Sequence, residues 1–113
     1  MSLVYKLLDG AAWRAAQAAG AFDGSEVDHR DGYIHFSAGD QVQETARRYF
    51  QGADGLMLVS VDAEALGSAL KWEPSRGGAL FPHLYGALPM TAVVAARPVA
   101  LDAAGVPQIG VLP

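Results

Sequence analysis

Two histidines, His35 and His83, are the side chains whose surroundings most suggest chemistry. Each lies within a short run of aromatic and aliphatic residues, Asp31–Ser37 for the first and Phe81–Gly86 for the second. A neutral imidazole has one donor and one acceptor, and leaving either unpaired in an apolar setting costs about 1–3 kcal/mol. Each ring therefore needs a buried partner or a cleft. Both interpretations stay open: a ring that binds ligand or moves a proton, and a ring that only satisfies the fold.

The residues around His35 predict a β-strand over positions 33–37, because aromatic and β-branched side chains dominate this stretch. Successive side chains of a strand point to opposite faces, so Tyr33 and Ser37 share a face with His35. Ile34 and Phe36 then point into the core. A polar and aromatic face backed by an apolar one is expected of a strand that lines a cleft.

Three further residues could contribute to a site near the second histidine. Glu73 ends an extended segment just before Pro74, where a carboxylate can enter a pocket, although a solvated glutamate fits this spacing as well. Arg76 lies in a Pro-Ser-Arg-Gly-Gly loop, from which a guanidinium can clamp an anion or simply remain in water. Tyr85 can serve as a stacking platform or as an aromatic at the edge of the core. Trp72 is predicted to be a core residue.

Composition excludes several classes of function. The chain of 113 residues has no cysteine, so it forms no disulfide and no thiolate metal site. Its net charge of −4 disfavours a broad nucleic-acid surface but allows a small phosphorylated ligand. No histidine spacing matches a zinc motif, so no metal is expected. Without a long apolar segment, we expect one soluble, cytoplasmic domain over residues 1–113.

The order of the predicted elements favours an α+β fold with helices early and strands late. Asp9 is expected to cap the first helix, and Ser37 with Asp40 the second. The Gly-, Asp- and Ser-rich stretch 20–32 is predicted to be a long loop, and the tail after Leu101 to be loosely attached. The predicted strands are 3–8, 33–37, 56–61, 70–73, 80–84 and 90–96, and the predicted helical segments are 11–19, 41–50 and 62–67.

Several segments together resemble a small bacterial family, the domain of unknown function numbered 952, over roughly residues 3–100. The two histidine segments are its most specific features, and the further matches are Val4–Leu7, Trp13 with Ala16 and Gly20, Gln41–Val42 and Lys71–Glu73. The resemblance implies the fold of the ADP-ribosyltransferases, in which two small, split antiparallel sheets enclose a cleft for NAD and helices pack on one side.

The first half also resembles the RNA 2′-phosphotransferases of that superfamily. Ile34–Ser37 corresponds to their second strand, which reads valine-histidine-leucine-serine. Tyr5 and Lys6 correspond to their first strand, but Lys6 stands where those enzymes have the histidine or arginine that holds the NAD ribose. A flexible ammonium does not reproduce an imidazole or a guanidinium. The late glutamate of many transferases has Glu73 as its candidate counterpart.

Roles for the site residues follow from this resemblance. His35 would hydrogen-bond ribose or phosphate, Tyr33 or Tyr85 would stack on a ring, and Tyr5, Lys6 and Ser37 are further candidates for ligand binding. Arg76 would meet the pyrophosphate, while His83 would orient or exchange a proton and Glu73 would face the developing cation. Three functions remain open: transfer of ADP-ribose from NAD or a related cleavage, nucleotide binding or sensing without chemistry, and an interaction domain. The expected partner of the first two is a small nucleotide.

Overall fold

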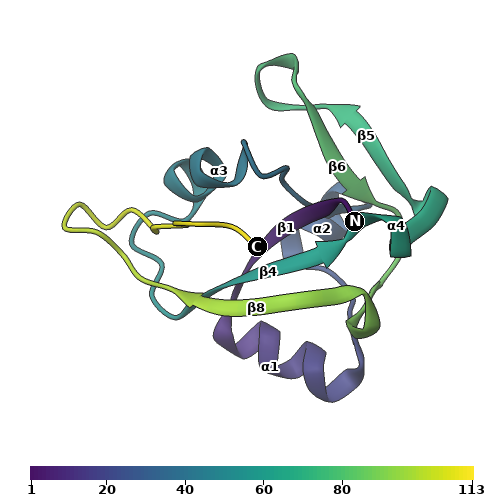
Figure 1. The fold of residues 1–113 in the computed structure, drawn as a ribbon, viewed down its shortest axis with the longest axis horizontal. Coiled ribbons are helices and arrows are strands. Elements are labelled where there is room, and N and C mark those ends of the chain that lie inside the picture. Colours follow the sequence, from purple (N-terminus) through teal and green to yellow (C-terminus); the bar gives the residue numbers. More distant parts are fainter.

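Three small antiparallel sheets organise the chain, which the computed structural model describes over residues 1–113 (Figure 1). The first sheet has the order β1-β4-β8, the second β3-β6-β5, and the third is the two-stranded ribbon β2-β7. The strands are β1 Leu3–Asp9, β2 Ala21–Phe22, β3 Ile34–His35, β4 Leu56–Asp62, β5 Leu70–Pro74, β6 Leu80–Leu84, β7 Leu88–Pro89 and β8 Val93–Val99. The α+β class and the two small antiparallel sheets are as predicted, and the ribbon was not predicted.

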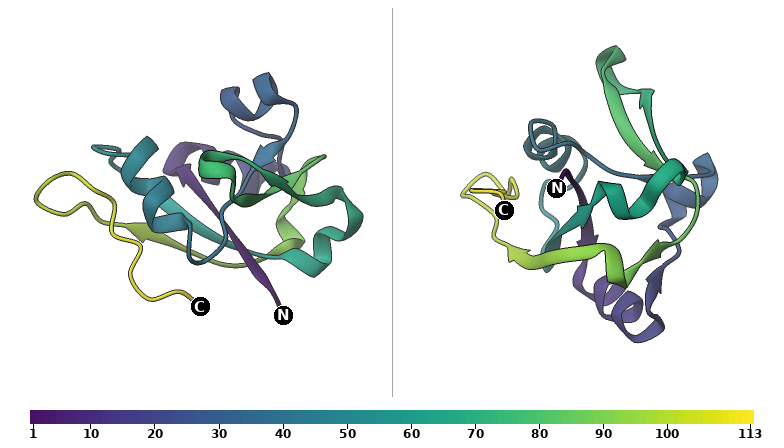
Figure 2. Two further views of the ribbon diagram at one scale, coloured as in Figure 1. Left: turned by 90° about the horizontal axis from the view of Figure 1, so that it is seen from above. Right: turned by 45° about the vertical axis from the view of Figure 1, so that its right-hand side comes forward.

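Four α-helices and three 3₁₀ turns connect these strands. The helices are α1 Gly10–Ala19, α2 Glu26–Asp31, α3 Val42–Tyr49 and α4 Ala63–Leu66. The turns are η1 Gly67–Ala69, η2 Arg76–Gly78 and η3 Met90–Ala92. Among the helices, none has the length and apolarity that crossing a membrane requires. The hairpin β5–β6 projects from the body of the molecule, as the right-hand view of Figure 2 shows.

Strand β1 joins the two three-stranded sheets. One of its edges pairs with β4 along its whole length, whereas the other meets the β3 segment only at Tyr5 and Ser37. These two residues exchange backbone hydrogen bonds of 2.8 and 2.9 Å. Because no further pairing continues this contact, the two sheets diverge from it and leave room for side chains between them.

The first sheet separates two clusters of buried residues. Alternation along β1 sends Val4 and Leu8 to one face and Tyr5 and Leu7 to the other. Helix α1 contributes Ala16 to the first cluster. Helix α3 contributes Val42 and Ala46 to the second cluster, with Leu56, Leu58, Val99 and Ile109. The two helices therefore cover opposite faces of this sheet, and the expectation that helices pack on one side is wrong.

Helix ends follow local chemistry, with one exception. Asp9 caps α1 by accepting from the Ala12 N–H at 2.7 Å. The predicted cap at Ser37 is wrong, because its hydroxyl bonds Thr45 Oγ1 at 2.9 Å and α3 has no side-chain cap. Ser37 is held instead by its backbone pairing with Tyr5 of β1 and by this contact of its hydroxyl with the side chain of Thr45 within α3.

The stretch 20–32 is not a loop, because it contains β2 and α2. Ser25 and Asp28 form a capping box, in which each side chain accepts from the other residue's backbone N–H. Gly32 ends α2 with a φ of 88°, a left-handed conformation that favours glycine. A helix of six residues has too short an apolar repeat to be read from periodicity, so only its capping pattern marks it in the sequence.

Two other predictions about packing are wrong. Trp72 is 48% exposed on the projecting β5–β6 hairpin, because no element covers that face of the hairpin at its position. The tail after Leu101 is attached: Ile109 is 2% exposed within the second cluster, and the Gln43 side chain bonds the backbone of both Pro107 and Ile109.

Candidate functional site

A cleft of about 830 Å³ lies where β1 meets β3 and β6, with α2, α3 and the η2 turn completing its walls. Seven of the nine site residues predicted from the sequence line it, and they come from four different segments. The seven are Tyr5, Lys6, Tyr33, His35, Ser37, Arg76 and His83. Glu73 and Tyr85 do not line the cleft, although both reach it indirectly through His83.

The two histidines are direct neighbours across the pairing of β3 with β6. Their ring centroids are 5.7 Å apart, and the Tyr33 ring stacks on His83 at 4.0 Å with an angle of 23° between the planes. Tyr33 also contacts His35 at 4.7 Å between centroids. Ile34 and Phe36 are both 3% exposed in the first cluster, as predicted for the core face of this segment, but Phe36 also borders the cleft.

Asp28, which was not predicted as a site residue, is a buried carboxylate in the wall of the cleft. This carboxylate is only 3% exposed, and it accepts hydrogen bonds from His35 Nδ1 at 2.6 Å and from Lys6 Nζ at 3.2 Å. The backbone N–H groups of His35 and Ser25 also donate to it, at 3.1 and 2.9 Å. Asp28 thus ties α2 to β1 and β3. Its one signal in the sequence is the Ser-x-x-Asp capping box, which says nothing of the distant partners.

The charges of Asp28 and Lys6 depend on each other. Burial alone would raise the pKa of Asp28, but the hydrogen bond from His35 and the Lys6 charge outweigh burial and hold this pKa well below its usual range. Burial lowers the pKa of Lys6, and the attraction of Asp28 partly offsets that effect. The Lys6 side chain is 10% exposed and contacts both carboxylate oxygens at 3.2 Å. The Lys6 ammonium is therefore already bound to Asp28 and would have to share its charge with any ligand.

His35 lies between two carboxylates. Its Nδ1 faces Asp28, and its Nε2 is 2.9 Å from Asp31 Oδ2. Hydrogen bonding to Arg30 and the charge of that residue hold the pKa of Asp31 below its usual range, so both carboxylates act as acceptors. Both contacts are hydrogen bonds only when the ring carries two protons, and a neutral ring keeps one of them. His35 thus joins β3 to two acidic residues of α2 at the rim of the cleft.

His83 has a hydrogen-bond partner, Glu73, on the neighbouring strand β5. Its Nδ1 is 2.8 Å from Glu73 Oε1, which also accepts from the Tyr85 hydroxyl at 2.7 Å. These two hydrogen bonds lower the pKa of Glu73, and the bond to Glu73 raises the pKa of Tyr85. Glu73 therefore orients the buried His83 ring from outside the cleft. It does not occupy the position from which a carboxylate would face a cation in the cleft.

Arg76, on the η2 turn, lies against β6 and α3. Its guanidinium lies 4.9 Å above the centre of the Phe81 ring, and its Nη1 is 3.4 Å from Thr45 Oγ1. The Thr45 hydroxyl is in turn bonded to that of Ser37. The structure brings no three histidine, aspartate or glutamate side chains together in an arrangement that could hold a metal ion.

Residues 7–96 match the family described as Protein of unknown function (DUF952). The chain belongs to the DUF952 family. Three solved structures are similar to it, and all are of protein CC0527 from Caulobacter crescentus. The crystal structure has 55% identity and a TM-score of 0.94, with 96% of each chain covered. A double mutant of CC0527 has 53% identity, a TM-score of 0.94 and the same coverage. The solution NMR structure has 55% identity and a TM-score of 0.87, with 97% of this chain and 95% of that chain covered. No curated protein matches the chain.

The DUF952 match confirms the family predicted from the two histidine segments, and it contains both of them. It also contains Asp28, Arg76 and the whole of α2. Tyr5 and Lys6 precede the matched residues. Asp28 is therefore paired with a lysine that lies outside the matched range.

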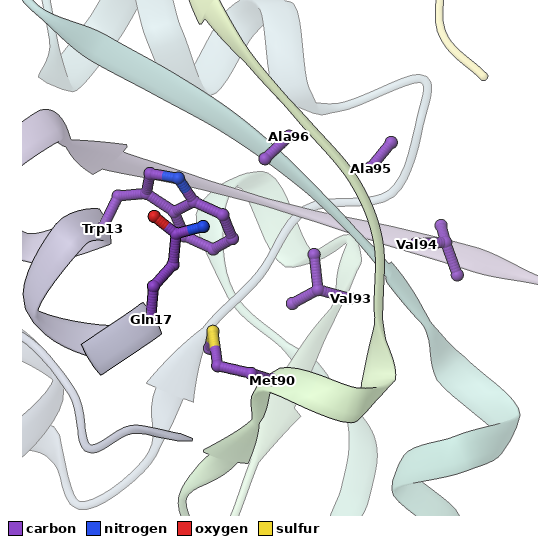
Figure 3. Close-up of a pocket in the computed structure, with 7 residues that line it drawn as sticks. All are labelled: Trp13, Gln17, Met90, Val93, Val94, Ala95 and Ala96. Atoms are coloured by element: carbon purple, nitrogen blue, oxygen red, sulfur yellow. The ribbon is translucent and has the colours of Figure 1, made fainter. Parts of the chain in front are cut away.

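The DUF952 chain has a second, smaller hollow of about 360 Å³ between α1 and β8 (Figure 3). Trp13 and Gln17 of α1 face the side chains of Met90, Val93 and Ala96 across it. None of its lining side chains titrates, whereas the cleft contains two histidines and several carboxylates. The cleft is therefore the candidate site.

Acidification below about pH 4 is expected to remove the stability that ionised Asp28 contributes. The folded-state pKa of Asp28 lies below the unfolded value of about 3.9, so the contribution is complete above that value and is lost as the pH falls through it. Urea unfolding of the wild type and Asp28→Asn measures this effect. The difference between the two chains should shrink as the pH falls below about 4 toward the folded-state pKa of Asp28. A difference that persists unchanged at about pH 3 would contradict the role of the carboxylate charge.

Proposed function

We propose that the cleft binds a nucleotide of the NAD or ADP-ribose type, on a fold of the ADP-ribosyltransferase kind, and that the protein acts as a nucleotide-binding or sensing module. One observation carries the proposal: an aromatic group formed by Tyr33, His35 and His83 shares a single cleft with Arg76. Aromatic faces bind planar rings, and a guanidinium binds phosphate. A cleft that offers both matches the two ends of a nucleotide.

The position of the cleft supports the comparison with that superfamily. The superfamily binds NAD between two split sheets, and here the cleft opens where β1 and the β3 segment separate after one pair of backbone hydrogen bonds. Tyr5 and Ser37 form that pair and line the cleft themselves. A ligand in this cleft would therefore contact both sheets.

The state of Lys6 and Glu73 favours binding over catalysis. Lys6 stands where the superfamily holds the NAD ribose, but its ammonium is already bound to buried Asp28. Glu73, the candidate for facing a cation, bonds His83 and Tyr85 outside the cleft. Catalysis needs groups that stabilise the transition state more than the ground state, and neither residue is free to do so.

A thermal-shift panel with NAD, ADP-ribose, AMP and a 2′-phosphorylated nucleotide tests the proposed function. A ligand at about 100 times its Kd should add about 2.7 kcal/mol to the free energy of unfolding and raise the Tm. Arg76→Gln should reduce the shift, whereas Arg14→Gln, which removes an exposed arginine away from the cleft, should leave it unchanged. If no member of the panel moves the Tm, the proposed function is wrong.

An enzymatic function is the second candidate, favoured by the 2.6 Å contact between His35 Nδ1 and Asp28. A carboxylate that fixes one ring nitrogen orients the other for proton transfer. The reaction would break the bond between nicotinamide and ribose, with nicotinamide leaving and an acceptor adding to the sugar. Release of nicotinamide from NAD by the wild type but not by His35→Ala, at equal binding of NAD, would establish it. Binding without release would leave the sensing function.

A further inference from the structure

The charges on the walls of the cleft leave one cation free. Three side chains with a fixed positive charge line the cleft: Lys6, Arg30 and Arg76. Lys6 contacts the Asp28 carboxylate at 3.2 Å, and Arg30 Nε contacts Asp31 Oδ1 at 3.1 Å. Arg76 has no carboxylate within the 4.0 Å of an ion pair. It is therefore the one position on these walls where an anion gains an attraction that no protein carboxylate already uses.

The surroundings of Arg76 hold its guanidinium in place for such an anion. The Phe81 ring supports it at 4.9 Å, and Thr45 bonds only one of its nitrogens, Nη1. A guanidinium carries five N–H donors, so most of them remain unused. Ser75 also lines this part of the cleft with a hydroxyl group, whereas the Ser37 hydroxyl is already bonded to Thr45. One phosphate group, which has three acceptor oxygens, would satisfy these donors.

A second phosphate would find no such partner. The carboxylates on the walls that no lysine or arginine neutralises are those of Asp9 and Glu26. A second phosphoryl group displaced from Arg76 toward them would meet like charge, which disfavours binding. Displaced away from them, it would remain in solvent and contribute little.

Along β6, the position suited to a phosphate and the position suited to a base ring are separated by about the width of one ribose. Phe81, beneath Arg76, and His83, beneath Tyr33, are two residues apart on the same strand, which corresponds to about 7 Å. We propose that the cleft recognises one nucleoside monophosphate unit, with its single phosphate on Arg76 and its ring at Tyr33, and that the rest of any larger nucleotide lies outside. This inference rests on the proposed function and narrows its ligand.

Calorimetric titration with two ligand series tests the inference. One series is adenosine, AMP and ADP, and the other is nicotinamide riboside, nicotinamide mononucleotide and NAD. In the series that binds, the first phosphate should improve Kd by about tenfold or more, because it gains charge-assisted hydrogen bonds. The second phosphate of ADP should change Kd by less than about threefold, and so should the adenylyl group by which NAD exceeds nicotinamide mononucleotide, because both would lie outside the cleft. Inorganic phosphate should compete weakly, since it lacks the ring.

Variants at Arg76 locate the phosphate. Arg76→Gln should abolish the gain from the first phosphate while leaving the Kd of the nucleoside within about twofold, and Arg76→Lys should restore part of the gain through its charge. Arg14→Gln is the matched control and should retain the full gain. Circular dichroism and the Tm of each variant confirm that it is folded.

The possible failures are distinguishable. A gain of about tenfold or more from the second phosphate, or a gain from the first phosphate that survives Arg76→Gln, would overturn the inference and leave nucleotide binding intact. Absence of binding in both series would overturn the proposed function, and the inference with it.

Discussion

Replacing Asp28 with alanine is expected to lower the free energy of unfolding by about 3–5 kcal/mol, a large share of the roughly 5–15 kcal/mol typical of a folded domain. The carboxylate is 3% exposed and accepts hydrogen bonds from Lys6, His35 and Ser25. Its removal leaves the buried ammonium of Lys6 without a counter-charge and takes away half of the capping box of α2. Chemical denaturation at pH 7 measures the loss.

Two controls make this prediction specific. Asp23→Ala removes an aspartate whose side chain is 88% exposed and should change the free energy of unfolding by less than about 0.5 kcal/mol. The double variant Lys6→Met with Asp28→Leu removes both charges together and should recover much of the stability, because an apolar pair can replace a buried ion pair. If Asp28→Ala costs no more than Asp23→Ala, or if the double variant is as unstable as the single one, the ion pair is not what holds α2.

The same contacts explain why part of the site could be predicted from the sequence. The residues of β3 alternate between cleft and core, a local rule that needs no knowledge of the fold, and Tyr33, His35 and Ser37 were assigned correctly by it. His83 was suggested by its apolar neighbours. Its pairing with His35 depends on the register of β3 with β6, which the sequence does not specify because 47 residues separate the two.

The role of Asp28 in the site could not be predicted from the sequence, because its side-chain partners lie outside its own helix. Lys6 is 22 positions away in the sequence, and His35 is seven. In isolation, an aspartate among Gly, Ser and Asp indicates a solvated loop, and the capping box accounts for it fully. Only the burial of α2 against β1 and β3 turns this cap into the partner of a buried lysine. The same holds for Lys6, which stands where the resembling enzymes have a histidine or arginine. From the sequence this difference indicated a lost ligand contact, whereas in the structure the lysine binds Asp28.

The C-terminal tail is a second place where local composition indicated the wrong structure, and it leads to the second large prediction. Ile109→Ala is expected to cost about 2–5 kcal/mol, the usual range for truncating a fully buried isoleucine. The side chain is 2% exposed and packs in the cluster with Tyr5, Leu7, Val42 and Val99. Equilibrium unfolding in urea measures the cost, with an unchanged slope as evidence that the unfolded state is the same.

Val111→Ala is the matched control, because Val111 is 91% exposed two positions further along the same tail. It should change the free energy of unfolding by less than about 0.5 kcal/mol. A loosely attached tail would make the two variants equal, and that outcome would contradict the packing of residues 107–109. A large difference would also matter for the cleft, since Tyr5 belongs to the same buried cluster as Ile109 and lines the cleft as well. Ile109→Ala should then weaken the proposed nucleotide binding without removing a residue of the cleft, because the cluster that positions Tyr5 is less tightly packed.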